Sequence, residues 1–408
     1  MTATATSTTY SSTGALESLP RTFSGYRRPD GQIGIRNHLM VVPATASANT
    51  VARRIAAMLP GSIALPVLDD DAEVPQSIDL TERTLAGAAA SPNAGASIIV
   101  GLSETRGEAE RIVSYARALA PGKPIEGFAI DQTGGSIKAI SRGVEIGQKL
   151  MPRLFMLQRE EASVAELIIG TECGGSDATS GMASNPTVGA FSDILVDFGG
   201  TTILSETTEL MGAEHVLARR ARDESVAKRI FEIVANVEKA ANAVGATVAG
   251  GNPTPGNMAG GLTTIEEKSL GCTYKAGTRT IQDVLDYGQR PTRRGLHIMD
   301  TPGHDCVSVS AKASAGGHMC IFTTGRGTAL GNAVYPVLKV CANPETCAKM
   351  SDNIDFDASP IVLGLSTKDE LGPELYKLAI DVCNGQLTCA ELIGHQEFCI
   401  HRHISEYL

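Results

Sequence analysis

Short apolar runs alternate with longer amphipathic stretches over most of this chain. In the first 160 residues, four apolar runs predict strands, at 32–42, 62–67, 96–101 and 124–129. Four amphipathic or Ala-rich stretches predict helices, at 44–59, 80–90, 108–118 and 134–150. Strands that alternate with helices in this order predict a parallel sheet with helices on both of its faces.

The same alternation continues in the second part of the chain. Its apolar runs predict strands at 167–170, 202–204, 296–299, 318–322 and 360–363. Helices are predicted up to residue 196 and at 213–248, 307–315 and 371–383. We therefore expect an α/β fold with two Rossmann-like three-layer domains and mainly parallel sheets. The expected divisions are a disordered tail at 1–22, an N-terminal α/β domain at 23–160, and a C-terminal α/β domain at 161–408 that carries most of the site loops.

Three predicted strands run into loops that are rich in glycine and polar residues. Their sequences are ECGGSD from Glu172, SETTE from Ser205 and FTTGRG from Phe322, and a fourth loop, GNPTPGN, begins at Gly251. Any one of these loops alone is more often a plain turn, because turns require the same residue types. Ligands of open α/β sheets bind beyond the carboxyl ends of the strands, so several such loops together predict one shared site.

Composition excludes some classes of function. The net charge is -10, which argues against a broad basic surface for nucleic acid. The sequence has no apolar run near the roughly 20 residues that cross a membrane. Its nine cysteines are odd in number and form no CxxC pair, which favours a reducing compartment over a disulfide framework. We expect a cytoplasmic homo-oligomer without nucleic-acid or membrane partners.

Longer motifs carry a family resemblance that runs in order from about Phe23. The motifs are GYRRPDGQIGIRN, ECGGSDATSGMASNPTVG, ILSETTEL, GNPTPGNMAGGLTTIEEKSLG, GQRPTRRGL and IFTTGRGTALG. They resemble the altronate/galactarate dehydratase family, which includes the large subunit of sulfolactate sulfo-lyase. The resemblance implies a lyase that eliminates water, or sulfite, from a small hydroxylated carboxylic acid to give a 2-keto acid. It also implies a divalent metal, iron(II) in several members, and a small SAF-type subunit as a partner.

The chemistry of this elimination suggests roles for individual residues. Removing a proton beside a carboxylate creates an enediolate, which needs a base and nearby positive charge. With the resemblance, Lys268 is the preferred base and Glu206 or Glu209 the alternatives; composition alone would favour an exposed helix charge for Lys268. Arg326 is the expected carboxylate clamp, because guanidinium binds carboxylates bidentately. Further substrate contacts are expected from Thr323, Thr324, Gly325, Asp177, Ser176, Asn185 and Asn252.

Candidate metal ligands are less well defined by the sequence. We expect Glu104, Cys173, His304 and Asp305 to be the ligands. In the sugar-acid dehydratases that the chain resembles, the first domain has His and Cys motifs, but here Ser103 stands where a Cys would precede Glu104. Iron(II) follows from the resemblance, while oxygen ligands would suit magnesium or manganese. An alternative function is a non-catalytic or isomerase-type relative that binds a hydroxy acid without elimination.

Overall fold

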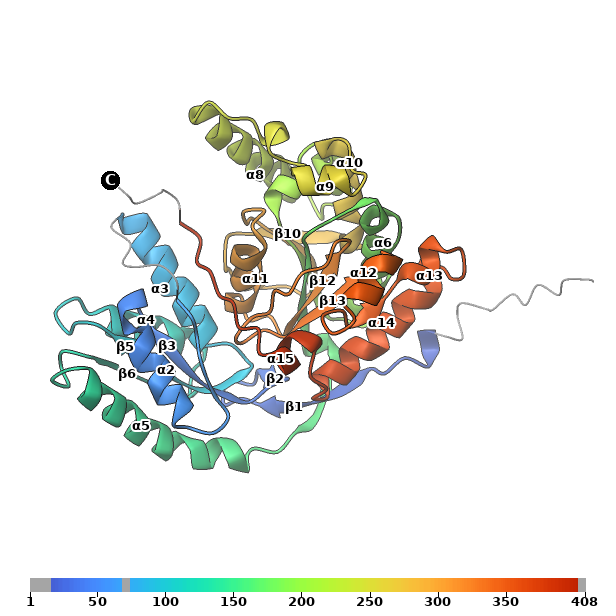
Figure 1. Ribbon diagram of the computed structural model, residues 1–408. Coiled ribbons are helices and arrows are strands. Elements are labelled where there is room, and N and C mark those ends of the chain that lie inside the picture. Colours follow the sequence, from blue (N-terminus) through green and yellow to red (C-terminus); the bar gives the residue numbers. More distant parts are fainter. Residues whose placement is uncertain (1–15, 68–73, 403–408) are drawn as a thin grey trace, which may run out of the picture.

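The computed structural model describes residues 16–67 and 74–402, and it contains two parallel sheets (Figure 1). The smaller sheet has four strands in the order β4, β3, β5, β6. Their bounds are Ser62–Ala64 for β4, His38–Pro43 for β3, Ala94–Gly101 for β5 and Ile125–Ala129 for β6. Every pairing in this sheet is parallel, as the alternation of strands and helices predicts.

Helices cover both faces of the four-stranded sheet. Helices α2 (Asn49–Ala57) and α5 (Ser136–Met156) pack on the face that carries Leu39 and Val41. Helices α3 (Pro75–Ala89) and α4 (Glu108–Leu119) pack on the opposite face. Successive side chains of a strand point to opposite faces, so the continuous apolar run in β3 supplies both layers.

The larger sheet has seven parallel strands in the order β10, β11, β9, β8, β12, β13, β14. Their bounds are Ile281–Leu285 for β10, Gly295–Met299 for β11, Thr201–Leu204 for β9, Ile168–Cys173 for β8, Met319–Thr324 for β12, Val337–Cys341 for β13 and Phe356–Asp357 for β14. One face packs against α6 (Asn185–Asp197), α8 (Glu224–Ala243) and α14 (Lys368–Cys383), and the other against α11 (Asp305–Ser314). The predicted α/β class with three-layer parallel sheets is confirmed.

Short helices occupy the loops of the larger sheet. They are α7 (Glu214–Ala218), α9 (Pro255–Ala259), α10 (Ile265–Thr273), α12 (Pro344–Lys349), α13 (Ser359–Val362) and α15 (Cys389–Ile393). The strand predicted at 360–363 is wrong, because this segment is helix α13. Pro360 stands in its first turn, where the fixed φ of proline favours a helix start.

A third, antiparallel sheet of three strands joins the start of the chain to the segment between the two larger sheets. Strand β1 (Thr22–Arg27) pairs with both β2 (Ile33–Gly34) and β7 (Glu160–Ser163). The single strand predicted at 32–42 is therefore two strands, β2 and β3. Arg36 lies in the break between these two strands. Its guanidinium donates to the carboxylate of Glu391, which is far away in the sequence.

The predicted tail needs a correction at its end. Residues 1–15 lie outside the described residues, but Leu19 is buried beside Phe23 and Thr22 already belongs to β1. Residues 19 and 22 of the expected tail are therefore part of the folded structure. The division at residue 160 stays a prediction; it falls at the first residue of β7.

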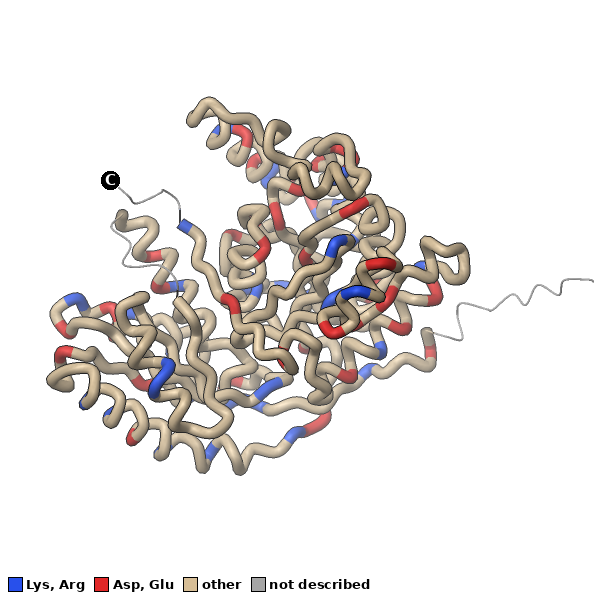
Figure 2. Tube along the Cα trace, in the orientation of Figure 1, with Lys and Arg blue, Asp and Glu red and all other residues tan. Residues whose placement is uncertain are grey.

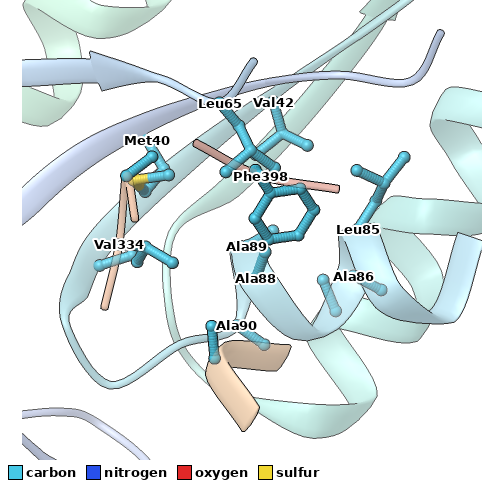
Figure 3. Packing of buried hydrophobic residues seen from close by; sticks show 14 of the residues in the cluster. Met40, Val42, Leu65, Leu85, Ala86, Ala88, Ala89, Ala90, Val334 and Phe398 are labelled. Carbon is cyan, nitrogen blue, oxygen red and sulfur yellow. The ribbon is translucent and has the colours of Figure 1, made fainter. Parts of the chain in front are cut away.

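A shared core holds the two larger sheets together. Phe398, near the end of the chain, is fully buried among Val42, Leu65 and Leu85 of the first part of the fold (Figure 3). Val334, from the loop before β13, joins the same cluster. This core fixes the orientation of the larger sheet's loops relative to the smaller domain.

Charges are mixed along the chain. Figure 2 shows Lys and Arg interspersed with Asp and Glu over the elements of both sheets. Over residues 16–67 and 74–402, no helix has the length and apolarity to cross a membrane.

Candidate active site

The loops beyond the carboxyl ends of the central strands surround one cavity of about 490 Å³. Its walls come from the loops after β8, β9, β11 and β12, together with residues 247–257 and helix α10. Eight of the residues singled out from the sequence line it: Cys173, Ser176, Glu209, Asn252, Lys268, His304, Asp305 and Arg326. Distant glycine-rich loops therefore do meet at one hollow, as expected for the edge of an open α/β sheet.

Helix α10 presents Lys268 to this cavity. Its Nζ donates to Glu209 Oε1 at 2.8 Å, to Asn252 Oδ1 at 2.7 Å and to Asn257 Oδ1 at 3.2 Å. Burial disfavours the charge on Lys268, but Glu209 outweighs burial and raises the pKa of Lys268. The amine is therefore protonated at neutral pH and cannot accept a proton in this state.

Glu209, unlike the protonated Lys268, has an oxygen atom that is free to accept a proton. Its Oε1 accepts from Lys268, while its Oε2 is buried without a hydrogen-bond partner among the described residues. Burial raises the pKa of Glu209, and Lys268 opposes that rise. Glu209 lines the cavity, and a carboxylate oxygen with no donor is chemically able to accept a proton.

Arg326 contributes an exposed guanidinium to the cavity. It lies against Gly256, where any Cβ would collide with Nη1. Within the described chain, the guanidinium of Arg326 makes no hydrogen bond or ion pair. The backbone of Arg326 is held in place because its N–H donates to Gly175 O at 2.9 Å. The group is thus available for a carboxylate.

Beneath the cavity, two thiols and two charged groups form a buried cluster. The Sγ atoms of Cys173 and Cys272 lie 3.1 Å apart. Lys275 Nζ lies 3.1 Å from Cys272 Sγ and 2.8 Å from Glu206 Oε2. Burial disfavours the charge on Lys275, but Cys173, Cys272 and Glu206 outweigh it and raise its pKa well above the ordinary value. Burial also opposes ionisation of Glu206, yet Lys275 lowers the pKa of this carboxyl.

The backbone at Glu206 is strained. Among the described residues it is the only non-glycine residue with a positive φ, at 70°. A left-handed conformation of this kind costs about 1–3 kcal/mol and persists where the surroundings enforce it. Here the N–H of Glu206 donates to Thr301 Oγ1 at 2.9 Å, and its carboxylate is held by Lys275. The turn therefore aims this carboxylate into the cluster.

A second buried group lies at the end of β8. Glu172 Oε2 accepts from Ser308 Oγ at 2.7 Å and from Ser205 Oγ at 3.3 Å, and it forms an ion pair with Lys312. Its other oxygen, Oε1, is buried with no hydrogen-bond partner in the described chain. Burial, followed by the charge of Glu206, raises the pKa of Glu172 well above the ordinary value.

Asp305 connects this second group to the cavity. One carboxylate oxygen each from Glu172, Glu206 and Asp305 lies within 4.8 Å of the others. Burial first and Glu206 second raise the pKa of Asp305 to about 7. Gly174 faces its carboxylate so closely that a Cβ would collide with Oδ2.

Comparison with known proteins identifies the family. Residues 25–154 match the second domain of D-galactarate dehydratase/altronate hydrolase, and residues 164–405 match the C-terminal domain of D-galactarate/altronate dehydratase. The chain belongs to the D-galactarate/altronate dehydratase family.

Named relatives of this family member span most of its length. It is 38% identical to (2R)-sulfolactate sulfo-lyase subunit beta of Chromohalobacter salexigens, over 94% of this chain and 97% of the relative. It is 35% identical to altronate dehydratase of Escherichia coli, over 92% of this chain and 77% of the relative. It is 32% identical to galactarate dehydratase (L-threo-forming) of Escherichia coli, over 90% and 73%. The family resemblance seen in the sequence motifs is confirmed.

The expected metal ligands do not form one set in this family member. Glu104 is exposed in the turn after β5 of the smaller sheet, where its N–H donates to Asp131 Oδ1 at 2.8 Å. Strand β5 and helix α10 lie far apart in the fold (Figure 1). His304 is exposed on the cavity wall and belongs to neither potential metal-binding group found among the described residues. Cys173 and Asp305 belong to different groups, the first with Glu206 and Cys272 and the second with Glu172 and Glu206. These donor sets fit a divalent metal, because thiols and carboxylates are its ordinary protein ligands.

Several of the expected substrate contacts make hydrogen bonds within the protein. Thr323 Oγ1 donates to Asn185 Oδ1 at 2.7 Å, and Thr324 Oγ1 accepts from Gly327 N at 3.0 Å. Neither Thr323, Thr324 nor Gly325 lines the 490 Å³ cavity. Their side chains brace the loop after β12, so the expectation that they contact substrate is not supported by their position.

Asp177 and Asn185 lie beside a neighbouring hollow of about 250 Å³, which also touches Ser176 and Lys268. Asp177 accepts from Thr179 Oγ1 at 2.6 Å and from Asn343 Nδ2 at 2.8 Å. Both carboxylate oxygens are thus already in use. Asp177 Oδ1 also accepts from Ser180 N at 3.2 Å, so this carboxylate caps the helical segment that begins after it.

Sequence reasoning missed four buried residues of the two clusters: Glu172, Cys272, Lys275 and Lys312. A signal was present for Lys312, which stands among small residues in VSVSAKASAGG and is fully buried in α11. Lys275 follows Cys272 by one helical turn, a spacing that places both on one face. A lysine in an otherwise small or apolar helix face is a sign of a buried ion pair.

Proposed function

We propose that this chain removes water, or sulfite, from the carbon next to the 2-hydroxy acid centre of a small hydroxylated carboxylic acid. The product is an enol that becomes a 2-keto acid. The class of enzyme, an elimination lyase, is confirmed by relatives named as dehydratases and a sulfo-lyase. These relatives do not favour binding without elimination. The observation that supports the site is that the Lys268–Glu209 pair and Arg326 line one cavity.

The proposed roles follow from the state of each side chain. Arg326 binds the substrate carboxylate through its guanidinium. Glu209 Oε2, which has no donor, takes the proton from the carbon that bears the 2-hydroxyl. Lys268 stays protonated and offsets the negative charge that develops on the enediolate. Lys268 is thus a cationic partner, and of the three bases considered from the sequence we favour Glu209.

Neutral donors and acceptors complete the cavity. Asn252, Ser176 and Thr254 line it beside the charged groups. Amides and hydroxyls of this kind bind substrate hydroxyls without adding charge. They would orient the leaving group so that it departs on the side facing the cavity. Measuring the release of sulfite during turnover distinguishes sulfite from water as the leaving group.

The metal of the family would be held by Cys173, Glu206 and Cys272. Two thiolates favour iron(II) over magnesium or manganese, because thiolates are soft ligands. When bound, a divalent metal acts as a Lewis acid that polarises a substrate oxygen. Lys275 keeps Glu206 ionised and oriented for this role.

We also propose a small SAF-type partner subunit, homo-oligomer formation and a cytoplasmic location. The partner is supported by the relative named as a subunit beta, which this chain covers over 97% of its length. Co-expression with a small subunit tests the partner, and gel filtration tests homo-oligomer formation. A single homogeneous monomer with full activity would exclude them.

The experiment for the proposed function is a substrate panel with the full chain, loaded with iron(II) without oxygen. Altronate, galactarate and sulfolactate are offered in turn, and 2-keto acid and sulfite are measured. We expect one of them to give a 2-keto acid. Absence of product from any 2-hydroxy acid, with the metal bound, would contradict the proposal.

A further inference from the structure

Glu206 belongs to both potential metal-binding groups of the described chain. In each group the ligand atoms all lie within 4.8 Å of one another. Cys173, Glu206 and Cys272 form the first, and Glu172, Glu206 and Asp305 form the second. One strained residue thus stands between two sets of ligands.

The two sets differ in chemistry. The first offers two sulfur atoms and one oxygen, whereas the second offers three carboxylate oxygens. Soft thiolates select iron or zinc, and carboxylate-only sites suit hard cations such as manganese(II) or magnesium. A soft or borderline ion is therefore favoured at the first set and a hard ion at the second. The difference points to two ions of different kind.

An unpartnered oxygen supports the carboxylate site independently. Glu172 is fully buried, and its Oε2 is already used by Lys312, Ser308 and Ser205. Its Oε1 has no donor among the described residues. A buried acceptor without a partner costs about 1–3 kcal/mol, which a bound cation would offset.

The local charge leaves room for a second cation. Three carboxyl groups, from Glu172, Glu206 and Asp305, face two ammonium groups, from Lys275 and Lys312. When all three carboxyl groups are ionised, as cation binding would require, they leave one negative charge in excess before either thiol is counted. Asp305 also lines the cavity, so an ion could enter from there.

We propose that Glu172, Glu206 and Asp305 bind a second, hard divalent cation, and that Glu206 bridges it to the metal at Cys173 and Cys272. The bridging role of Glu206 rests on the proposed function, because that proposal supplies the metal at Cys173 and Cys272. The second site stands on its own ligands. The ion would lie between the cavity and the buried lysines.

Two spectroscopic probes separate the sites in the full chain, freed of metal and kept under reducing conditions. Cobalt(II) reports thiolate ligands through its charge-transfer absorption, and manganese(II) reports oxygen ligands through loss of its free-ion resonance signal. We expect one cobalt and one manganese to bind together. Displacement of one ion by the other would overturn the two-ion proposal.

Variants then assign the ligands. Asp305→Asn should weaken manganese by more than about tenfold and leave the cobalt band, Cys272→Ser should do the reverse, and Glu206→Gln should weaken both. Asp300→Asn is the matched control, since Asp300 is a partly buried carboxyl that bonds Thr207 Oγ1 at 2.6 Å outside both groups. Circular dichroism checks that each variant is folded.

The outcomes distinguish this inference from the proposed function. Manganese binding that is unchanged by both Asp305→Asn and Glu172→Gln overturns the second site, even if elimination proceeds with one metal. Binding of both ions as expected supports the second site, even if no acid in the panel is converted.

Discussion

Lys268 Nζ donates to Glu209 Oε1 at 2.8 Å, while Glu209 Oε2 is buried without a hydrogen-bond partner among the described residues, and both residues line the 490 Å³ cavity. The side chains are 9% and 7% exposed, so the pair is desolvated yet open to a bound acid. One oxygen of the carboxylate is thereby fixed in orientation and the other is free. This asymmetry separates the cation from the base in the proposed reaction.

Glu209→Gln should therefore abolish proton removal while substrate binding persists. The amide keeps the shape and can still bond Lys268 through its oxygen, but it cannot accept a proton. We expect kcat to fall by about 10²–10⁴ with little change in KM. Glu266→Gln, the same change at an exposed position of α10, is the control. Equal kinetics for both variants would remove Glu209 from the mechanism.

Arg326→Ala should act mainly on binding. Loss of a charged hydrogen-bonding partner costs about 1.5–3 kcal/mol, which is about a 10- to 150-fold rise in KM. Arg294→Ala provides the control, because Arg294 lines a separate hollow that includes Thr201 at the start of β9. Steady-state kinetics with the best acid of the panel measure both. An unchanged KM for Arg326→Ala would mean that another group holds the carboxylate.

Thr323→Val tests the structural assignment of the loop after β12. The substitution removes the donor to Asn185 Oδ1 and leaves that buried acceptor unpaired. We expect the free energy of unfolding to fall by about 1–3 kcal/mol, while KM changes by less than about twofold. Urea unfolding measures the change in the free energy of unfolding, and steady-state kinetics on the same sample measure the change in KM. A large rise in KM at unchanged stability would restore Thr323 as a substrate contact.

His318 should make the fold sensitive to acid. Its Nδ1 accepts from Ile168 N at 2.9 Å and its Nε2 donates to Ile33 O at 2.8 Å, so the buried ring is neutral. Burial lowers the pKa of His318 from 6.5 to about 4. Because the folded pKa lies below the unfolded one, its stabilising contribution is complete above about pH 6.5 and is lost as the pH falls toward 4.

At pH 5 this loss amounts to about 2 kcal/mol for His318 alone. His318→Gln cannot titrate, so its free energy of unfolding should fall by about 2 kcal/mol less than that of the wild type between pH 7.5 and 5. The comparison cancels other buried groups such as His38, which both proteins share. Equal losses would show that His318 is not the acid-sensitive group.

The fold was largely predictable because buried parallel strands are continuous apolar runs. The run at 96–101 lies within β5, and the predicted helix at 371–383 lies within α14. The prediction was wrong at 360–363, where a short apolar run cannot distinguish a strand from a helix and Pro360 decides for the helix. Strand β1 was missed because it pairs with residues 160–163, a contact that no local pattern reveals.

The site was predictable where residues follow strand ends, and less so where partners come from other elements. Glu209 and Arg326 stand in the loops that the pattern singled out. Lys275 and Lys312 were missed because each sits inside a helix and acquires its role only by packing against Glu206 or Glu172. The role of Thr323 could not be read from its residue type, because a buried loop brace and a substrate contact use the same hydroxyl.

The most direct test of the account is proton exchange followed by nuclear magnetic resonance. The metal-loaded chain is incubated in deuterated water with each acid of the panel. The account predicts a 2-keto acid carrying one deuterium at the carbon that lost water or sulfite, and no such product with Glu209→Gln. Tight binding of an acid with neither deuterium uptake nor elimination would contradict it.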